Sequence, residues 1–135
     1  MKRRILIVLT LFLLGQIAEA NPLMVVEQDY NAALAVAQEH DKMILIDFYT
    51  TWCAPCKKLD KLIFKNEDAQ EIIAQNFVLL KYDAEKDKDY HLSKKHHVFS
   101  YPTALTLTNE GYVVNRKYGF RGEDYESLST SVFDF

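Results

Sequence analysis

The sequence has only two cysteines among its 135 residues, so it cannot form the multi-disulfide framework that stabilises many small secreted domains. Its basic residues form no stripe that could neutralise phosphates, and its formal net charge is −3, which argues against nucleic acid as a partner. No repeat, low-complexity tract or linker divides the chain. These absences indicate one domain with a single modest core.

The apolar run near the N-terminus, Ile5–Leu14, is about ten residues long, whereas a membrane-spanning helix needs ~20. The basic residues Lys2–Arg4 precede it, and Ala18-Glu19-Ala20 follows with the small-x-small pattern of a signal-peptidase site. We therefore expect residues 1–20 to be an export signal cleaved after Ala20, which leaves residues 21–135 as the domain. An uncleaved membrane anchor is the alternative. Without the signal, the chain has 13 basic and 18 acidic residues, a net charge of −5.

Both cysteines lie in the stretch Thr50–Lys57, which reads Thr-Thr-Trp-Cys-Ala-Pro-Cys-Lys. The apolar run before it, Met43–Tyr49, predicts a buried strand, and apolar residues recur at helical intervals from the second cysteine to Ile63. Cys53 is therefore expected in the first turn of a helix, where unpaired backbone N–H groups and the helix macrodipole favour a thiolate. Cys56 follows on the same face, within reach for a disulfide.

The spacing of the two cysteines indicates reactivity rather than stapling, because closing so short a loop constrains the unfolded chain little. The Cys-x-x-Cys spacing also occurs in zinc sites, so a zinc half-site is the alternative. The sequence has no second such pair, and its four histidines lie outside the motif. We therefore expect no bound metal.

The apolar periodicities and capping residues predict an α/β domain with a mixed sheet and helices on both of its faces. Strands are expected at Pro22–Val26, Met43–Tyr49, Phe77–Asp83, Thr103–Thr108 and Tyr112–Tyr118, the last two joined as a hairpin. Helices are expected from a cap at Asp29 to about His40, from Cys53 to about Lys65, after a cap at Asn66, in the second half of Glu85–His97, and over Glu123–Phe133.

Two of these helical segments carry further expectations about burial. The helix after Asn66 is expected to bury Ala69, Ile72 and Ile73. The charged segment 85–97 is interpreted as a mostly solvated face. Three histidines lie in it, His91, His96 and His97, and we interpret them as a solvated helix end rather than as a metal site or a pH switch.

With these elements in place, the chain resembles the thioredoxin-fold family of thiol:disulfide oxidoreductases over nearly all of residues 21–135. Three features carry the resemblance: the Trp-Cys-x-Pro-Cys-Lys signature at Trp52–Lys57, the carboxylate of Asp47 six residues before the first cysteine, and Tyr101-Pro102-Thr103 at the start of the late strand. The chain is similar to exported reducing members, including the periplasmic C-terminal domain of the thiol:disulfide interchange transporter. It differs from thioredoxin in having Ala54 where thioredoxin has glycine.

The resemblance implies a thioredoxin-like fold with a sheet of four to five strands, and it implies roles for the residues of the motif. Cys53, the more exposed sulfur, attacks a disulfide of a partner protein, and Cys56 resolves the mixed disulfide. Asp47 lies in an otherwise apolar strand, and it accepts the proton of Cys56. A solvated strand edge is the alternative environment for this carboxylate.

The same resemblance implies roles for further residues. Pro102 is expected to follow a cis peptide bond, which brings the backbone of Tyr101 against the cysteines for strand-like pairing with a substrate. Tyr101 and Trp52 are expected to contact the substrate, although packing also accounts for Trp52. Lys81 matches a family lysine near the buried carboxylate, and it is either a modulator of Asp47 or a surface residue.

The leading hypothesis is an exported, periplasmic reductant of protein disulfides that a membrane electron donor reduces again. An oxidant or isomerase using the same cysteines is the close alternative, and a binding module without catalysis is the alternative from another class. No cofactor is expected, and the chain is expected to be a monomer.

Overall fold

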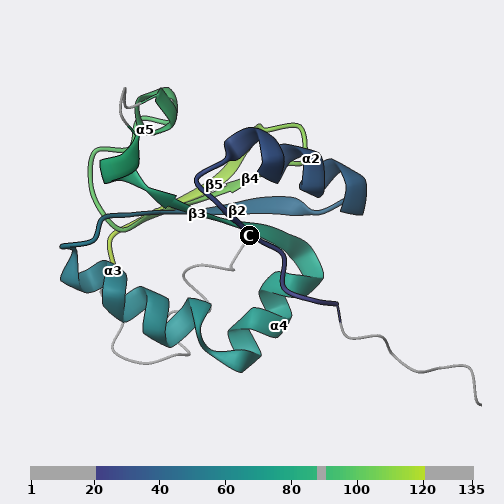
Figure 1. Cartoon of the computed structure of the whole chain (residues 1–135), viewed down its shortest axis with the longest axis horizontal. Coiled ribbons are helices and arrows are strands. Elements are labelled where there is room, and N and C mark those ends of the chain that lie inside the picture. The colour runs from purple at the N-terminus through teal and green to yellow at the C-terminus, as the bar shows by residue number, and fades with distance from the viewer. Residues whose placement is uncertain (1–20, 88–90, 121–135) are drawn as a thin grey trace, which may run out of the picture.

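The computed structural model describes residues 21–87 and 91–120, which form a central sheet with helices on both of its faces (Figure 1). In this part of the chain the sheet has five strands in the order β1-β3-β2-β4-β5. The strands are β1 Val25–Glu27, β2 Met43–Tyr49, β3 Phe77–Asp83, β4 Thr103–Leu107 and β5 Val113–Tyr118. Strands β1, β3 and β2 run parallel, whereas β4 is antiparallel to both β2 and β5. The predicted mixed sheet and the predicted hairpin are therefore confirmed.

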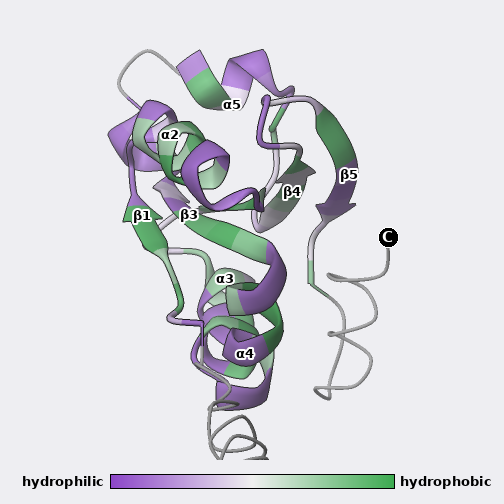
Figure 2. Ribbon diagram, turned by 90° about the vertical axis from the view of Figure 1, so that its right-hand side faces the viewer, coloured by the Kyte–Doolittle hydropathy of each residue, from purple (hydrophilic) through white to green (hydrophobic). Residues whose placement is uncertain are grey.

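The helices of the described residues are α2 Tyr30–His40, α3 Ala54–Leu59, α4 Glu67–Asn76 and α5 His91–Lys95. Helices α2 and α5 cover one face of the sheet, and α3 and α4 cover the other (Figures 1 and 2). Both predicted caps are present, because the side chain of Asp29 accepts the Ala32 N–H at 2.9 Å and that of Asn66 accepts the Ala69 N–H at 3.1 Å.

Each face of the sheet has its own apolar core, as the alternation of strand side chains requires. The core under α2 and α5 includes Ile44, Ile46, Phe48, Leu80 and Leu105, and the core under α3 and α4 includes Leu45, Leu59, Ile63, Ile73 and Leu79. Figure 2 shows the hydrophobic strands between the two helical layers. Asp47 points to the α3 face, between two residues whose side chains enter the opposite core.

Two expectations about the α3 and α4 helices are corrected. Ile72 is 38% exposed, because the buried stripe of α4 follows Ala69, Ile73 and Ala74 and leaves Ile72 at its edge. The helix expected from Cys53 to about Lys65 is regular only to the end of α3. It continues as a wider π-helical turn, Asp60–Phe64.

The strand registers place three connections at one edge of the sheet. Tyr49, the last residue of β2, pairs with Asp83, the last residue of β3. Phe48 pairs with Thr103, the first residue of β4. The β2–α3 connection, the turn after β3 and the segment before β4 therefore meet at this edge, which we call the active-site edge below.

Two predicted segments lie outside the described residues, namely the N-terminal signal at 1–20 and the last helix, Glu123–Phe133. Within the part that is described, no helix has both the length and the apolar character that crossing a membrane requires.

Candidate active site

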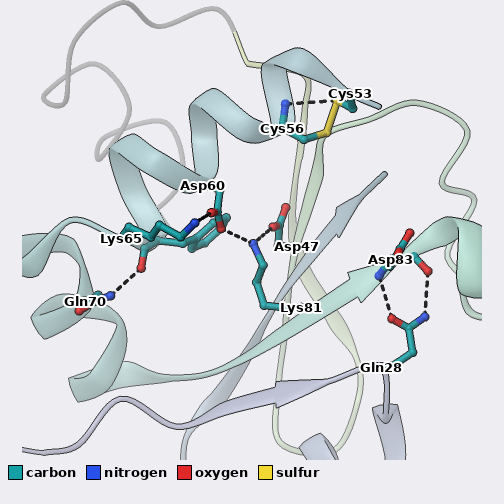
Figure 3. Close-up of polar contacts among 10 residues, drawn as sticks. Gln28, Asp47, Cys53, Cys56, Asp60, Lys65, Gln70, Lys81 and Asp83 are labelled. Atoms are coloured by element: carbon teal, nitrogen blue, oxygen red, sulfur yellow. Dashed lines mark hydrogen bonds and ion pairs between the residues drawn. A yellow bond between two sulfur atoms is a disulfide. The ribbon is translucent and has the colours of Figure 1, made fainter. Parts of the chain in front are cut away.

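Cys53 and Cys56 form a disulfide at the start of α3, with their Cα atoms 5.3 Å apart (Figure 3). Cys53 is the N-cap of α3, and its Sγ accepts the backbone N–H of Cys56 at 3.2 Å. Pro55 lies in the first turn, where a proline leaves no additional N–H without a partner. The expected position of the first cysteine is confirmed. The same N–H would stabilise a thiolate on Cys53 once the disulfide is reduced.

The expectation that Cys53 is the more exposed cysteine is wrong for this oxidised state. Cys53 is 3% exposed and Cys56 is 5% exposed. The physical reason is the cap geometry, because the Cys53 sulfur turns back over the helix start toward the Cys56 N–H. A cleft of about 410 Å³ opens beside the second cysteine, and it is lined by Tyr49, Thr50, Thr51, Cys56, Lys57, Asp60, Lys65 and Lys81.

Lys81 joins two carboxylates beneath the disulfide (Figure 3). Its Nζ lies 2.5 Å from Asp47 Oδ2 and 2.8 Å from Asp60 Oδ1. Asp60 also pairs with Lys65 at 2.6 Å. Asp47 is buried in the central strand β2, so the alternative of a solvated strand edge is excluded. Lys81 lies beside Asp47 and is not a surface residue, since its side chain is only 16% exposed; its role as a modulator stays a prediction.

Burial and the charges of this network together shift the pKa values of its three members. Burial raises the pKa of Asp47, although the attraction of Lys81 and its hydrogen bond oppose that rise. Burial alone would lower the pKa of Lys81, but its attraction to Asp47 and its hydrogen bonds to both carboxylates raise it. For Asp60, burial is outweighed by the hydrogen bonds from Lys65 and Lys81, which lower its pKa.

Aromatic rings complete the surroundings of the Lys81 ammonium group. Its Nζ lies 4.5 Å from the centre of the Phe64 ring and 5.0 Å from that of Tyr49. The π-helical turn that carries Phe64 also carries Asp60, so one irregular turn supplies both an anionic and an aromatic partner. The lysine is thereby held between the buried Asp47 and the cleft beside Cys56.

The loop before the cysteines is fixed by the 3-10 turn Ala84–Lys86, which follows β3. In this turn, Glu85 accepts the backbone N–H of Thr51 at 2.8 Å and its hydroxyl at 2.6 Å. Trp52, the next residue along the chain, is 68% exposed. Glu85 therefore anchors the loop while leaving the indole of Trp52 available to a partner.

The remaining predicted residues lie at the active-site edge. The Tyr101–Pro102 peptide bond is cis, as the resemblance implied. Pro102 directly precedes β4, whose first residue pairs with Phe48 of β2, and Tyr101 is half-buried. The structure thus gathers Trp52, the cysteine pair, Tyr101 and Pro102 at one edge of the sheet.

The sequence reasoning missed Asp60 and Glu85. Asp60 lies four residues after Cys56, which puts both on one helical face, and that spacing was a usable signal. Glu85 gave no such signal, because its contact with Thr51 bridges 34 residues.

The interpretation of the three histidines as a solvated helix end is wrong for His96. His91 and His97 are exposed, but His96 is buried, with its ring edge-on to Tyr30 at a centroid distance of 6.0 Å. Burial and the nearby charges of Lys95 and Arg116 lower the pKa of His96 to about 4. Among residues 21–87 and 91–120, no three His, Cys, Asp or Glu side chains gather as metal ligands.

A family model described as thioredoxin-like matches residues 25–108. Thioredoxin-1 of Drosophila melanogaster is 31% identical over 104 residues, which cover 77% of this chain and 87% of that protein. The thiol:disulfide interchange protein DsbD of Vibrio cholerae is 34% identical over 99 residues, which cover 70% of this chain but only 16% of DsbD. The match therefore concerns a small part of that relative.

Solved structures share the architecture. A candidate disulphide-isomerase from Bacteroides thetaiotaomicron is 36% identical, with a TM-score of 0.66 over 85% of this chain and 97% of that one. A thioredoxin from Thermus thermophilus has a TM-score of 0.69 at 20% identity over 84% of this chain and 86% of that one. The second of these similarities concerns the fold alone.

Proposed function

The chain belongs to the thioredoxin-like family, and from that membership we propose that it is an exported thiol:disulfide oxidoreductase that reduces disulfides of partner proteins. The observation that carries the proposal is the Cys53–Cys56 disulfide at the start of α3, directly above the Asp47–Lys81 pair. The helix start favours a thiolate on Cys53. Cys56 and Lys81 line one cleft, and the buried carboxylate of Asp47, paired with Lys81 behind that cleft, offers a proton acceptor.

The reaction proceeds by two exchanges. The Cys53 thiolate of the reduced protein attacks one sulfur of a partner disulfide, a bond forms between Cys53 and the partner, and the other partner sulfur leaves as a thiolate. Cys56 gives its proton to Asp47 and attacks the Cys53 sulfur. The Cys53–Cys56 bond then forms and the second partner sulfur leaves. The partner gains two electrons and takes up two protons, and this protein is oxidised.

The position of Asp47 supports the reductive direction. An acceptor for the Cys56 proton speeds the step that releases a reduced partner. A dithiol on a membrane electron donor is the proposed reductant that restores the two thiols. We place this cycle outside the cytoplasm because residues 1–20 have the pattern of an export signal.

Isomerisation is the second candidate, and the 36% identical candidate isomerase favours it. An isomerase returns a mispaired substrate to activity without a net loss of disulfides, whereas a reductase leaves free thiols. Counting thiols on a scrambled substrate protein during its reactivation separates the two activities.

The proposal is tested by trapping. Cys56→Ser leaves the attacking sulfur in place but removes the resolving one, so partner proteins are expected to accumulate as disulfides to Cys53. The matched control Cys53→Ser is expected to trap none of them. A variant with both Cys53→Ser and Cys56→Ser cannot form a covalent bond to a partner. If it still captured the same partners, the protein would instead be a binding module.

A further inference from the structure

The connection between α5 and β4 presents an apolar cleft that the exchange chemistry does not use. The cleft has a volume of about 550 Å³ and is lined by Ser93, Lys94, His97, Val98 and Phe99. Phe99 is 79% exposed, the most exposed large apolar side chain among the described residues. Ser93 Oγ is buried and has no hydrogen-bond partner in the described part of the chain. The cleft therefore combines an apolar surface with a buried hydroxyl that has no partner in the described part of the chain.

The backbone around this cleft is held in place, so the exposure of Phe99 does not come from a loose loop. The Val98 N–H donates to the Ser93 carbonyl at 2.8 Å, and the Thr103 hydroxyl donates to the Ser100 carbonyl at 2.7 Å. Val98 itself is buried. An aromatic side chain fixed in water on a rigid segment is a typical anchor for a partner.

The charge of this region is opposite to that of the rest of the chain. No acidic residue occurs between His91 and Thr108, although residues 21–135 carry a net charge of −5. Lys94 lines the cleft, and the ammonium group of Lys95 lies 4.7 Å from the centre of the Tyr30 ring. Asp87, which accepts the Ser93 N–H at 3.1 Å, is buried. Lys94 therefore gives the exposed border of the cleft a positive charge, which favours a partner with carboxylates.

The cleft is adjacent to the candidate active site. Phe99 precedes Pro102 by three residues, so their Cα atoms lie within about 11 Å of each other. Tyr101 and Pro102 lie at the active-site edge, where a substrate would pair with the backbone. An extended polypeptide bound there would reach the cleft within about three residues.

We propose that this cleft, with Phe99 and Lys94, is a docking subsite for substrate polypeptides that carry an apolar side chain and a carboxylate a few residues from their reactive disulfide. The inference rests on the proposed function, because it assigns specificity to the same active-site edge. A polypeptide fits better than a lipid surface, because the apolar residues line a cleft and lie only a few positions before Tyr101 and Pro102.

The test uses disulfide peptides that are identical except at two neighbouring positions a few residues from the reactive cysteine. These two positions carry Leu-Glu, Ser-Glu, Leu-Lys or Ser-Ser. The protein is expected to have a kcat/KM for the Leu-Glu peptide roughly fivefold or more above that for the others. Phe99→Ala and Lys94→Glu, both at exposed positions, are expected to remove this preference. Both variants are expected to reduce a small linear disulfide, bis(2-hydroxyethyl) disulfide, at the unchanged rate.

Two control variants make the comparison specific. Lys61→Glu makes the same charge change at an exposed position of the π-helical turn, and Tyr112→Ala removes an exposed ring at the hairpin, at the opposite end of β4. Both are expected to retain the preference for the Leu-Glu peptide. Equal losses in all four variants, or no loss in any of them, would overturn the subsite.

A binding measurement separates this inference from the proposed function. A Leu-Glu peptide with serines in place of its cysteines cannot react, and its fluorescence anisotropy reports docking alone. Suppose that this peptide binds, that Phe99→Ala and Lys94→Glu weaken its binding, and that the protein reduces no disulfide. The proposed function then fails and the subsite stands. If the peptide does not bind, and anionic phosphatidylserine vesicles bind through the same two residues instead, the cleft recognises a membrane and the inference fails.

Discussion

At the scale of single residues, Asp47 is a buried carboxylate that we expect to reduce stability and for which we propose a role in proton transfer. Its carboxylate is buried, and one of its oxygens, Oδ1, has no hydrogen-bond partner among the described residues. Lys81 offsets part of the desolvation, but Lys81 also pairs with Asp60. Removing the charge of Asp47 therefore does not leave Lys81 without a partner.

Asp47→Asn is expected to raise the free energy of unfolding at pH 7 by roughly 1–2 kcal/mol. Because burial raises the pKa of Asp47 above its unfolded value of about 3.9, the folded wild-type protein binds more protons and loses stability as pH rises above about 4. The higher free energy of unfolding of the variant should therefore be present at pH 7 and absent at low pH. Urea unfolding of both proteins at several pH values measures this difference.

The same substitution is expected to slow disulfide exchange, by about 10²-fold for loss of a proton acceptor. Stopped-flow measurement of partner release separates this step from the first attack. Asp60→Asn is the matched control, since it removes a carboxylate from Lys81 but leaves Asp47 in place. Equal slowing in both variants would show that the charge of the network matters rather than Asp47 itself.

His96 gives a second residue-scale prediction. Its pKa of about 4 lies below the unfolded value of about 6.5, so the unfolded chain binds more protons between these pH values. The free energy of unfolding should therefore fall by about 1–2 kcal/mol as pH decreases through this window. His96→Phe should flatten that slope in urea titrations from pH 7 to pH 4. An unchanged slope would contradict the buried, neutral state of His96.

At the scale of elements, the start of α3 is positioned by contacts from other elements as well as by its own sequence. The β2–α3 loop is anchored by Glu85 from the turn after β3, and Lys81 of β3 reaches the π-helical turn at the far end of α3. One end of the cysteine-bearing helix is thus attached to β3, and the other end to the turn that follows β3. Such double attachment holds the first turn in the geometry that favours a thiolate.

Glu85→Ala is expected to loosen the β2–α3 loop, because Thr51 loses the acceptor of both its N–H and its hydroxyl. Amide hydrogen exchange at Thr51 should accelerate roughly tenfold. Glu85→Gln keeps an oxygen acceptor and should restore much of the protection. The hydrogen bonds from Thr51 lower the pKa of Glu85, so protection in the wild type should persist at neutral pH and be lost only as pH falls through that lowered pKa.

At the scale of the whole molecule, the charge is unevenly distributed. The net charge of residues 21–135 is −5, whereas residues 91–108 contain lysine and histidine but no acid. This cationic segment includes the residues that precede β4 at the active-site edge. Association with acidic partners should therefore weaken as salt screens the charges.

Export is the prediction that concerns the whole chain. When all 135 residues are expressed in a bacterial host with two membranes, the product is expected in the periplasm with Asn21 as its first residue. Intact-mass spectrometry of the periplasmic fraction measures the N-terminus. A product that keeps residues 1–20 and sediments with membranes would support the uncleaved anchor.

Much of the fold could be predicted from the sequence, because its signals are local. Apolar runs mark β2 and β3, Asp29 and Asn66 mark helix starts, and the Cys-x-x-Cys pair marks the start of α3. The cysteine pair could be recognised from the sequence alone, because the two residues are only three positions apart. Their disulfide could be predicted without knowing the rest of the fold.

What only the tertiary structure decided are the contacts between residues distant in sequence. Lys81 reaches Asp47 across 34 residues, and Glu85 reaches Thr51 across the same separation. His96 is buried against Tyr30, and Ile72 is left exposed, because packing of whole elements fixes how a short helix is rotated. The sequence by itself therefore determined where the sulfurs lie, whereas the packing of the sheet and helices decided which charges surround them.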